Sequence, residues 1–159
     1  MIQNKIWLYL DDVRIPKDNQ WEVVTNYDEF VAHINLHGLE NYECISLDHD
    51  LGEEAMQEYY RNVATNGFIE YNNIGEKTGL DCARYIVNLS MSNKIPLPKV
   101  YCHSANPVGA RNIINHVNSY LKNQELEESC NMVKIEHTYR ELSSEVKTTR
   151  LAIKKGHLN

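Results

Sequence analysis

The segment SLDHDLG, residues 46–52, follows an apolar run and places two carboxylates and an imidazole side by side. Ionisable groups at the end of a buried strand cost stability, so such a cluster indicates a functional site. Two other apolar runs end in the same way, one at Asp11 and Asp12 and one at His103 and Ser104. Because ligands bind at the carboxyl ends of parallel strands in open α/β sheets, we expect these groups to share one polar site.

Apolar runs and helical patterns alternate along the chain, which predicts a doubly wound, mainly parallel α/β sheet. Five strands are expected, at residues 6–10, 21–25, 44–47, 99–102 and 132–136. Helices are expected at residues 27–36, 54–63, 79–90, from 107 onward and at 142–155. The connection between the first two strands is too short for a full helix, so the first helix of a flavodoxin-like fold is predicted to be shortened or missing.

The chain of 159 residues fits a single domain, 1–159. Residues 53–77 are interpreted as an insertion that lies over the functional edge as a lid, and residues 142–159 as a helical tail. The net charge of −6 disfavours a broad nucleic-acid-binding face. No apolar run approaches the roughly 20 residues that span a bilayer, and no signal peptide is recognised. We therefore expect a cytoplasmic protein that does not enter a membrane.

Four ordered motifs carry a resemblance to a known family: LYLDDVRIP, ISLDHDLG, TGLD and CHSANPVGA. The acidic pair, the aspartate after the third strand and Ser104 resemble the phosphoacceptor site of a receiver domain. The chain departs from ordinary receivers where they carry Lys-Pro, because that position reads Glu136-His137-Thr138 here. Together the motifs, which span the chain from residue 6 to the fifth strand, are similar to the cyclic-phosphate processing receiver-like family, a divergent receiver fold.

This resemblance implies a phosphoesterase whose substrate is a nucleotide or RNA end carrying a cyclic phosphate, such as a 2′,3′-cyclic phosphate. The alternative is a non-catalytic receiver-like module that binds a nucleotide or a protein partner. A true phosphoacceptor regulator is a third interpretation. The missing Lys-Pro and the two added histidines argue against it.

Acid–base chemistry is assigned to His49, His103 and Asp48. Opening a cyclic phosphodiester requires a base and an acid, and imidazole serves as either near neutral pH. Asp11, Asp12 and Asp50 are candidate ligands for Mg²⁺ or Mn²⁺, because hard cations bind carboxylate oxygens. Asp48 and Asp50 point to the same side of an extended segment, so either one is a candidate ligand while the other orients a histidine.

Phosphate binding is assigned to four residues: Arg14, Ser104, Asn106 and Gly109. Arg14 offers a bidentate clamp, and Ser104 a hydroxyl donor. Asn106 and Gly109 begin a helix whose free N–H groups form an anion site. The structural alternatives are an ion pair between Arg14 and Asp12 or Asp18, and plain capping roles for Ser104 and Asn106.

Overall fold

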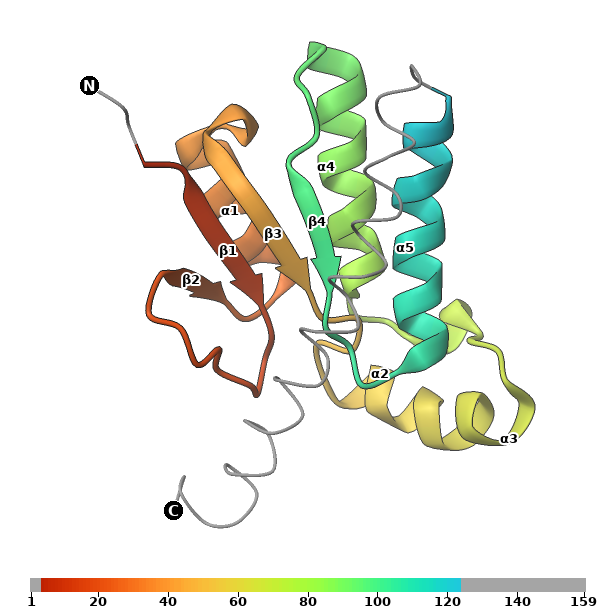
Figure 1. The fold of residues 1–159 in the computed structure, drawn as a ribbon. Helices are drawn as coiled ribbons and strands as arrows, with labels where there is room; N and C mark the ends of the chain where they lie inside the picture. Colours follow the sequence, from red (N-terminus) through yellow and green to blue (C-terminus); the bar gives the residue numbers. More distant parts are fainter. Residues whose placement is uncertain (1–3, 124–159) are drawn as a thin grey trace.

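A parallel sheet organises the chain in the computed structural model, which describes residues 4–123 (Figure 1). Its strands are β1 (Ile6–Leu10), β2 (Trp21–Val24), β3 (Tyr42–Leu47) and β4 (Lys99–Cys102). They lie in the order β2-β1-β3-β4, and every neighbouring pair is parallel. The predicted α/β fold with a parallel sheet is thus confirmed for this part of the chain. The predicted fifth strand at 132–136 and the tail helix at 142–155 lie outside the described residues.

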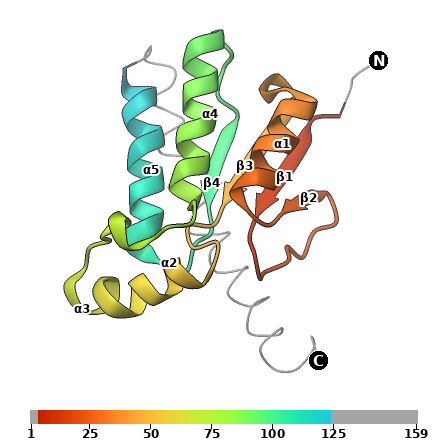
Figure 2. The same cartoon turned by 180° about the vertical axis from the view of Figure 1, so that it is seen from behind.

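Three long helices lie together on one face of this sheet (Figures 1 and 2). They are α1 (Tyr27–His37), α4 (Gly79–Asn93) and α5 (Pro107–Lys122). Alternate residues of the strands, such as Leu8, Leu10, Ile45 and Leu47, join the apolar faces of the helices in one buried core. Burying each such side chain contributes on the order of 1.5–3 kcal/mol, which holds the strand ends in fixed positions. Within residues 4–123, no helix is both long and apolar enough to cross a membrane.

Each of these helices begins at a side-chain cap that the sequence indicates. Asn26 accepts a hydrogen bond from the Glu29 N–H (2.8 Å) at the start of α1. Thr78 and Asp81 form a capping box at α4, and Asn106 caps α5 with Pro107 at the first helical turn. Such caps satisfy N–H groups that have no partner inside the helix.

The connection between β1 and β2 contains no helix, as the sequence predicts. Residues 11–20 form turns and irregular backbone, and β2 lies directly beside β1. This loop starts with Asp11 at the carboxyl end of β1 and carries Arg14. The first helix of a doubly wound fold is therefore replaced by a loop that delivers charged side chains to the edge of the sheet.

The segment between β3 and α4 is mostly helical. It contains α2 (Glu53–Glu58), the π-helical turn η2 (Tyr59–Val63), α3 (Ala64–Asn66) and the 3₁₀ turn η3 (Tyr71–Asn73), while η1 (Leu39–Asn41) precedes β3. The helix expected at 54–63 begins one residue earlier and continues through α3. In Figure 1 this segment lies below the carboxyl ends of β3 and β4.

A buried carboxylate, Glu58, holds this segment together. It accepts hydrogen bonds from the Asn62 Nδ2 (2.8 Å), the Asn73 Nδ2 (3.0 Å) and the Glu70 N–H (2.8 Å). The hydrogen bond from Asn62 is the largest of the contributions that lower the pKa of Glu58. Because Glu58 is 1% exposed, losing these partners would leave a buried charge unsatisfied, so they fix η3 against α2.

The TGLD motif packs against the functional edge of the sheet. The Gly79 N–H donates to the His49 carbonyl (2.9 Å). A Cβ atom on Gly79 would lie 1.7 Å from the Asp48 carbonyl oxygen, which is backbone and has little freedom to move. A glycine is therefore required where α4 supports the backbone of Asp48 and His49.

Replacing Gly79 with alanine is expected to destabilise the protein by about 1–3 kcal/mol or more, because the added methyl group displaces the backbone of Asp48. Denaturant unfolding measures this change. Gly75→Ala is the matched control, since the nearest atom there is the flexible Glu54 carboxylate at 3.0 Å. Equal stabilities for the two variants would contradict the close packing of α4 on Asp48.

Candidate functional site

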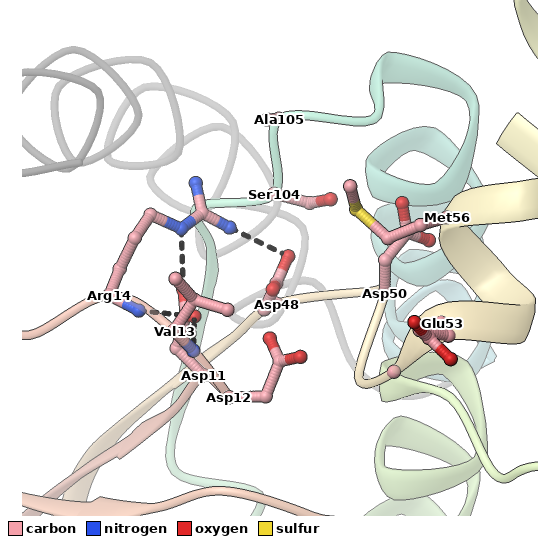
Figure 3. Close-up of a pocket in the computed structure, with 11 residues that line it drawn as sticks. Asp11, Asp12, Val13, Arg14, Asp48, Asp50, Glu53, Met56, Ser104 and Ala105 are labelled. Carbon is pink, nitrogen blue, oxygen red and sulfur yellow. Dashed lines mark hydrogen bonds and ion pairs between the residues drawn. The ribbon is translucent and has the colours of Figure 1, made fainter. Parts of the chain in front are cut away.

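A cavity of about 200 Å³ lies at the carboxyl ends of the strands, beside α2 (Figure 3). Its lining residues are Asp11, Asp12, Val13, Arg14, Asp48, Asp50, Gly52, Glu53, Met56, Ser104 and Ala105. In Figure 3, the residues that follow β1 lie on one side, and Asp50, Glu53 and Met56 lie on the other. The fold thus brings together most of the polar residues that the sequence assigns to one site, and α2 adds Glu53 and Met56.

A buried guanidinium joins the ends of three strands. The Arg14 Nε donates to Asp11 Oδ2 (2.6 Å), its Nη2 pairs with Asp48 Oδ1 (2.9 Å), and its Nη1 donates to the His103 carbonyl (3.2 Å). Arg14 is only 2% exposed. Burial by itself would lower the pKa of Arg14, but Asp48 and Asp11 together raise it. Arg14 thus has a structural role, as the alternative from the sequence proposed, but its partners here are Asp11 and Asp48, whereas the sequence pattern named Asp12 or Asp18.

The backbone of the β1–β2 loop folds around Asp11. Asp11 Oδ1 accepts the N–H groups of Val13 (2.9 Å) and Arg14 (2.8 Å), which closes a tight turn directly after β1. Burial works against ionisation of Asp11, yet the hydrogen bond from His103 and the nearby charges lower its pKa. Asp11 is therefore held as a carboxylate.

Asp48 is in the opposite electrostatic situation. Burial, followed by the charge of Asp11, raises the pKa of Asp48 to about 8, although Arg14 lies beside it. The two neighbouring carboxyl groups therefore differ strongly in acidity, and Asp48 retains a proton near neutral pH in the protein without a bound cation.

Three carboxylates are close enough to share one cation. Asp11, Asp12 and Asp48 each offer an oxygen, and these oxygens lie within 4.8 Å of one another. Within residues 4–123, no other set of three acidic, histidine or cysteine side chains brings its ligand atoms this close together. The sequence left Asp48 and Asp50 as alternatives for the third ligand; the geometry places Asp48 in this group, while Asp50 contacts His49. The donor set consists of oxygens only, which suits a hard divalent cation.

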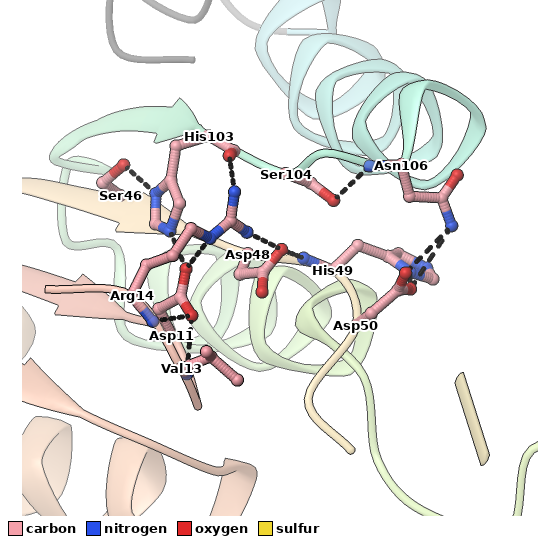
Figure 4. Close-up of polar contacts among 10 residues, drawn as sticks. All are labelled: Asp11, Val13, Arg14, Ser46, Asp48, His49, Asp50, His103, Ser104 and Asn106. Carbon is pink, nitrogen blue, oxygen red and sulfur yellow. Dashed lines mark hydrogen bonds and ion pairs between the residues drawn. The ribbon is translucent and has the colours of Figure 1, made fainter. Parts of the chain in front are cut away.

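His103 lies behind Asp11 and not in the pocket (Figure 4). Its ring is fully buried and stacks on the Tyr9 ring at 4.1 Å. Its Nδ1 contacts Ser46 Oγ (2.7 Å), and its Nε2 contacts Asp11 Oδ2 (3.1 Å). Desolvation lowers the pKa of His103, so the neutral ring donates from Nε2 to Asp11 and accepts from the serine hydroxyl.

His49 is also fully buried, on the other side of the site. Its Nδ1 contacts Asp50 Oδ1 (2.6 Å), and its Nε2 contacts the Tyr71 hydroxyl (2.9 Å). A residue that exchanges a proton with a substrate must come within hydrogen-bond distance of it. In this structure both rings contact carboxylates that line the pocket, which is the geometry of orienting partners, and the direct acid–base role expected from the sequence stays a prediction.

The loop before α5 carries the remaining predicted residues. Ser104 lines the pocket, and its Oγ accepts the Asn106 N–H (3.1 Å). Asn106 caps Gly109 (3.0 Å) and donates from Nδ2 to the Asp50 carboxylate at 3.3 and 3.4 Å. A Cβ atom on Gly109 would lie 2.4 Å from the His49 ring, so this glycine lets α5 approach the imidazole. Asn106 and Gly109 therefore support the site from behind, and Ser104 faces the pocket.

Sequence reasoning missed four residues at this site: Ser46, Glu53, Met56 and Tyr71. A polar residue inside the apolar strand β3 is a usable signal for Ser46. Glu53, Met56 and Tyr71 belong to the segment between β3 and α4, whose pattern carries no motif that points to the pocket.

The comparison with protein families bears directly on this arrangement. A family model described as "Cyclic-phosphate processing Receiver domain" matches residues 6–119. The chain belongs to this family. All residues that line the pocket fall within the matched range. A search of curated proteins and a search of solved structures found no match. This receiver-like domain is thus tied to cyclic-phosphate processing through its family.

The acidity of Asp48 predicts a pH dependence of folding stability. A raised pKa means that the folded state holds this proton more tightly than the unfolded chain, whose aspartates titrate near about 4. The stabilising contribution is therefore complete below about pH 4 and is lost as pH rises through about 8. In EDTA, Asp48→Asn should gain stability relative to the unmodified protein by up to about 1.4 kcal/mol per pH unit across this window.

Denaturant unfolding between pH 5 and pH 9 measures the difference. Asp18→Asn serves as the control, because Asp18 is exposed on the same β1–β2 loop. A constant difference between Asp48→Asn and the unmodified protein over this range would contradict the raised pKa of Asp48.

Proposed function

We propose that this receiver-like domain is a phosphoesterase that hydrolyses cyclic phosphates, with a 2′,3′-cyclic phosphate of a nucleotide or RNA end as substrate. The observation that carries the proposal is the pocket at the strand ends, which lies within the matched family range. It combines Asp48 and Asp50, whose surroundings differ, with Arg14 and the Ser104 hydroxyl. A buried carboxyl group with a raised pKa, here Asp48, is suited to act as an acid.

Asp50 is the proposed proton acceptor. It lines the pocket, and its carboxylate is held by the His49 ring and by Asn106 Nδ2. A water molecule that attacks phosphorus would lose its proton to this carboxylate. The hydrogen bond from His49 Nδ1 keeps the Asp50 carboxylate oriented while it takes up this proton and loses its negative charge.

Ser104 and Arg14 are the proposed phosphate-binding groups. The Ser104 hydroxyl faces the pocket and can donate to a phosphate oxygen. Arg14 already pairs with Asp11 and Asp48, so its main contribution is positive charge at the pocket wall and not a free bidentate clamp. Phosphate recognition therefore also requires another source of positive charge.

A divalent cation fits that requirement. Asp11, Asp12 and Asp48 would hold Mg²⁺ or Mn²⁺ through their clustered oxygens, and the cation would neutralise phosphate charge and activate water. With a cation bound, Asp48 would serve as an ionised ligand, and the proton that Asp50 takes from the attacking water would pass to the departing ribose oxygen. Without the cation, Asp48 keeps a proton that it can donate to the departing ribose oxygen. The effect of EDTA on turnover distinguishes these two roles.

One observation favours a non-catalytic alternative. Both histidines of the motifs are fully buried and their ring nitrogens contact protein groups, so neither is free for a substrate. A module that only binds a nucleotide or a protein partner would tolerate this arrangement. Tight binding of a cyclic nucleotide without turnover would support that alternative.

The decisive experiment is a turnover screen with 2′,3′-cyclic nucleotides, 3′,5′-cyclic nucleotides and RNA ends that carry a cyclic phosphate. We expect hydrolysis of 2′,3′-cyclic substrates, measured as release of a phosphomonoester. Asp50→Asn should lower the rate by about 10²–10⁴, the usual contribution of a general base, while Asp18→Asn should leave it unchanged. A full rate in Asp50→Asn would remove Asp50 from the reaction.

Cation binding gives an independent prediction. Mg²⁺ or Mn²⁺ should raise the melting temperature of the unmodified protein, because a ligand that binds the folded state stabilises it. Asp12→Asn should abolish this rise by removing one of the three ligands. Glu53→Gln should retain it, since Glu53 lines the pocket outside the group of three. No heat of binding in calorimetry with either cation would contradict the proposed site.

A further inference from the structure

A line of hydrogen bonds runs from the pocket wall into the segment between β3 and α4. Asp50 Oδ1 contacts His49 Nδ1 (2.6 Å), His49 Nε2 contacts the Tyr71 hydroxyl (2.9 Å), and Asn112 Nδ2 donates to that hydroxyl (3.0 Å). Figure 4 shows the pocket end of this line, with Asp50 between His49 and Asn106. The line connects β3, η3 and α5, which are far apart in sequence.

The donors along this line fix the direction of each bond. Asn112 donates to the Tyr71 oxygen, so the phenolic hydrogen is available for His49 Nε2. The Asp50 carboxylate can only accept, so Nδ1 of the neutral ring carries the proton and Nε2 is left to accept from the Tyr71 hydroxyl. Asn106 supports the same arrangement, because its oxygen accepts the Gly109 N–H and its amide nitrogen therefore faces Asp50.

The His49 ring has little room for any other arrangement. It is fully buried, and Gly109 lies against its face. Tyr71 itself is positioned by η3, which Glu58 holds through Asn73 Nδ2 and the Glu70 N–H. The hydroxyl of Tyr71 is thus presented to His49 by a turn that is anchored elsewhere.

We infer that Tyr71 is a positioning residue that donates to Nε2 of the Nδ1–H tautomer of His49 and so holds the ring, and through it the Asp50 carboxylate, at the pocket wall. Its importance for turnover rests on the proposed hydrolysis of cyclic phosphates. The tautomer of His49 follows from the hydrogen bonds alone. Orienting a carboxylate through a neighbouring imidazole is a common way to set the geometry of a site.

Ring nitrogen chemical shifts of the histidines test the tautomer directly in the full chain, at pH 8 and in EDTA. We expect His49 to show a protonated Nδ1 and an unprotonated Nε2. Tyr71→Phe should move the Nε2 shift toward that of a nitrogen without a hydrogen bond, because Nε2 loses its donor. Asn112→Leu should do the same to a smaller degree while the phenol remains. Tyr60→Phe is the matched control, since Tyr60 is 67% exposed and lies on the same segment.

A protonated Nε2 in the unmodified protein, or unchanged shifts in Tyr71→Phe, would overturn the inference whether or not any substrate is turned over. On a 2′,3′-cyclic nucleotide, Tyr71→Phe should lower kcat by about 10–100-fold with little change in KM. A changed Nε2 shift with a full kcat would overturn the positioning role. If the unmodified protein hydrolyses no cyclic phosphate, the proposed function fails, and the chemical shifts still decide the tautomer.

Discussion

The site is organised by one buried cation, Arg14, placed between carboxyl groups from two strands. A guanidinium that is 2% exposed must have its charge compensated nearby, and the ionised Asp11, which follows β1, does this. The carboxyl group of Asp48, which follows β3, is the second partner of Arg14. The third donor contact, to the carbonyl of His103, ties in the end of β4. Removing one partner of a buried ion pair generally costs about 3–5 kcal/mol, so the three strand ends are linked in a way that tolerates little change. The β1–β2 loop, which replaces the first helix, makes these contacts possible because it leads Arg14 back to the carboxyl end of β1.

Two layers of side chains surround this ion pair. Carboxyl groups line the pocket, and the histidines lie behind them, His103 against Asp11 and His49 against Asp50. The histidine rings are themselves held in place. Tyr9 and Ser46 contact the ring of His103, and Tyr71 and Gly109 contact the ring of His49. Such support is expected where carboxyl groups must keep a fixed orientation. The orientation and tautomer of an imidazole decide where its hydrogen bond points and whether its nitrogen donates or accepts.

Much of the fold could be predicted from local signals in the sequence. Apolar runs that end in polar residues mark the strand ends, and Asn26, Thr78 and Asn106 mark helix starts that the structure confirms as caps. The short link after β1 correctly indicated the missing helix. These features are predictable because each depends on residues that are close in sequence.

The finer geometry of the site depends on contacts that no local pattern contains. Strict alternation would put Asp48 and Asp50 on the same side, but the backbone bends at His49, so Asp48 turns to Arg14 and Asp50 turns to α5. The partners of Arg14 come from three strands, and the packing of the histidine rings depends on Tyr9 and Gly109. Tyr71 reaches His49 from a turn that is set by the buried Glu58, and nothing in the sequence around Tyr71 indicates that contact.

The charge of the pocket constrains any chemistry that it supports. The described lining holds five carboxyl groups, those of Asp11, Asp12, Asp48, Asp50 and Glu53, against the single guanidinium of Arg14. A phosphate ester brings a further negative charge into this space, and at short range in a partly buried site such repulsion is large. Binding of an anion must therefore be coupled to the uptake of a proton or of a cation.

Asp48 is suited to both, because its raised pKa lets it keep a proton, and its oxygen lies with those of Asp11 and Asp12. Asp48 would then set both the pH range in which the domain binds an anion and its requirement for a cation. A ligand that carries its own positive charge would bind without either dependence.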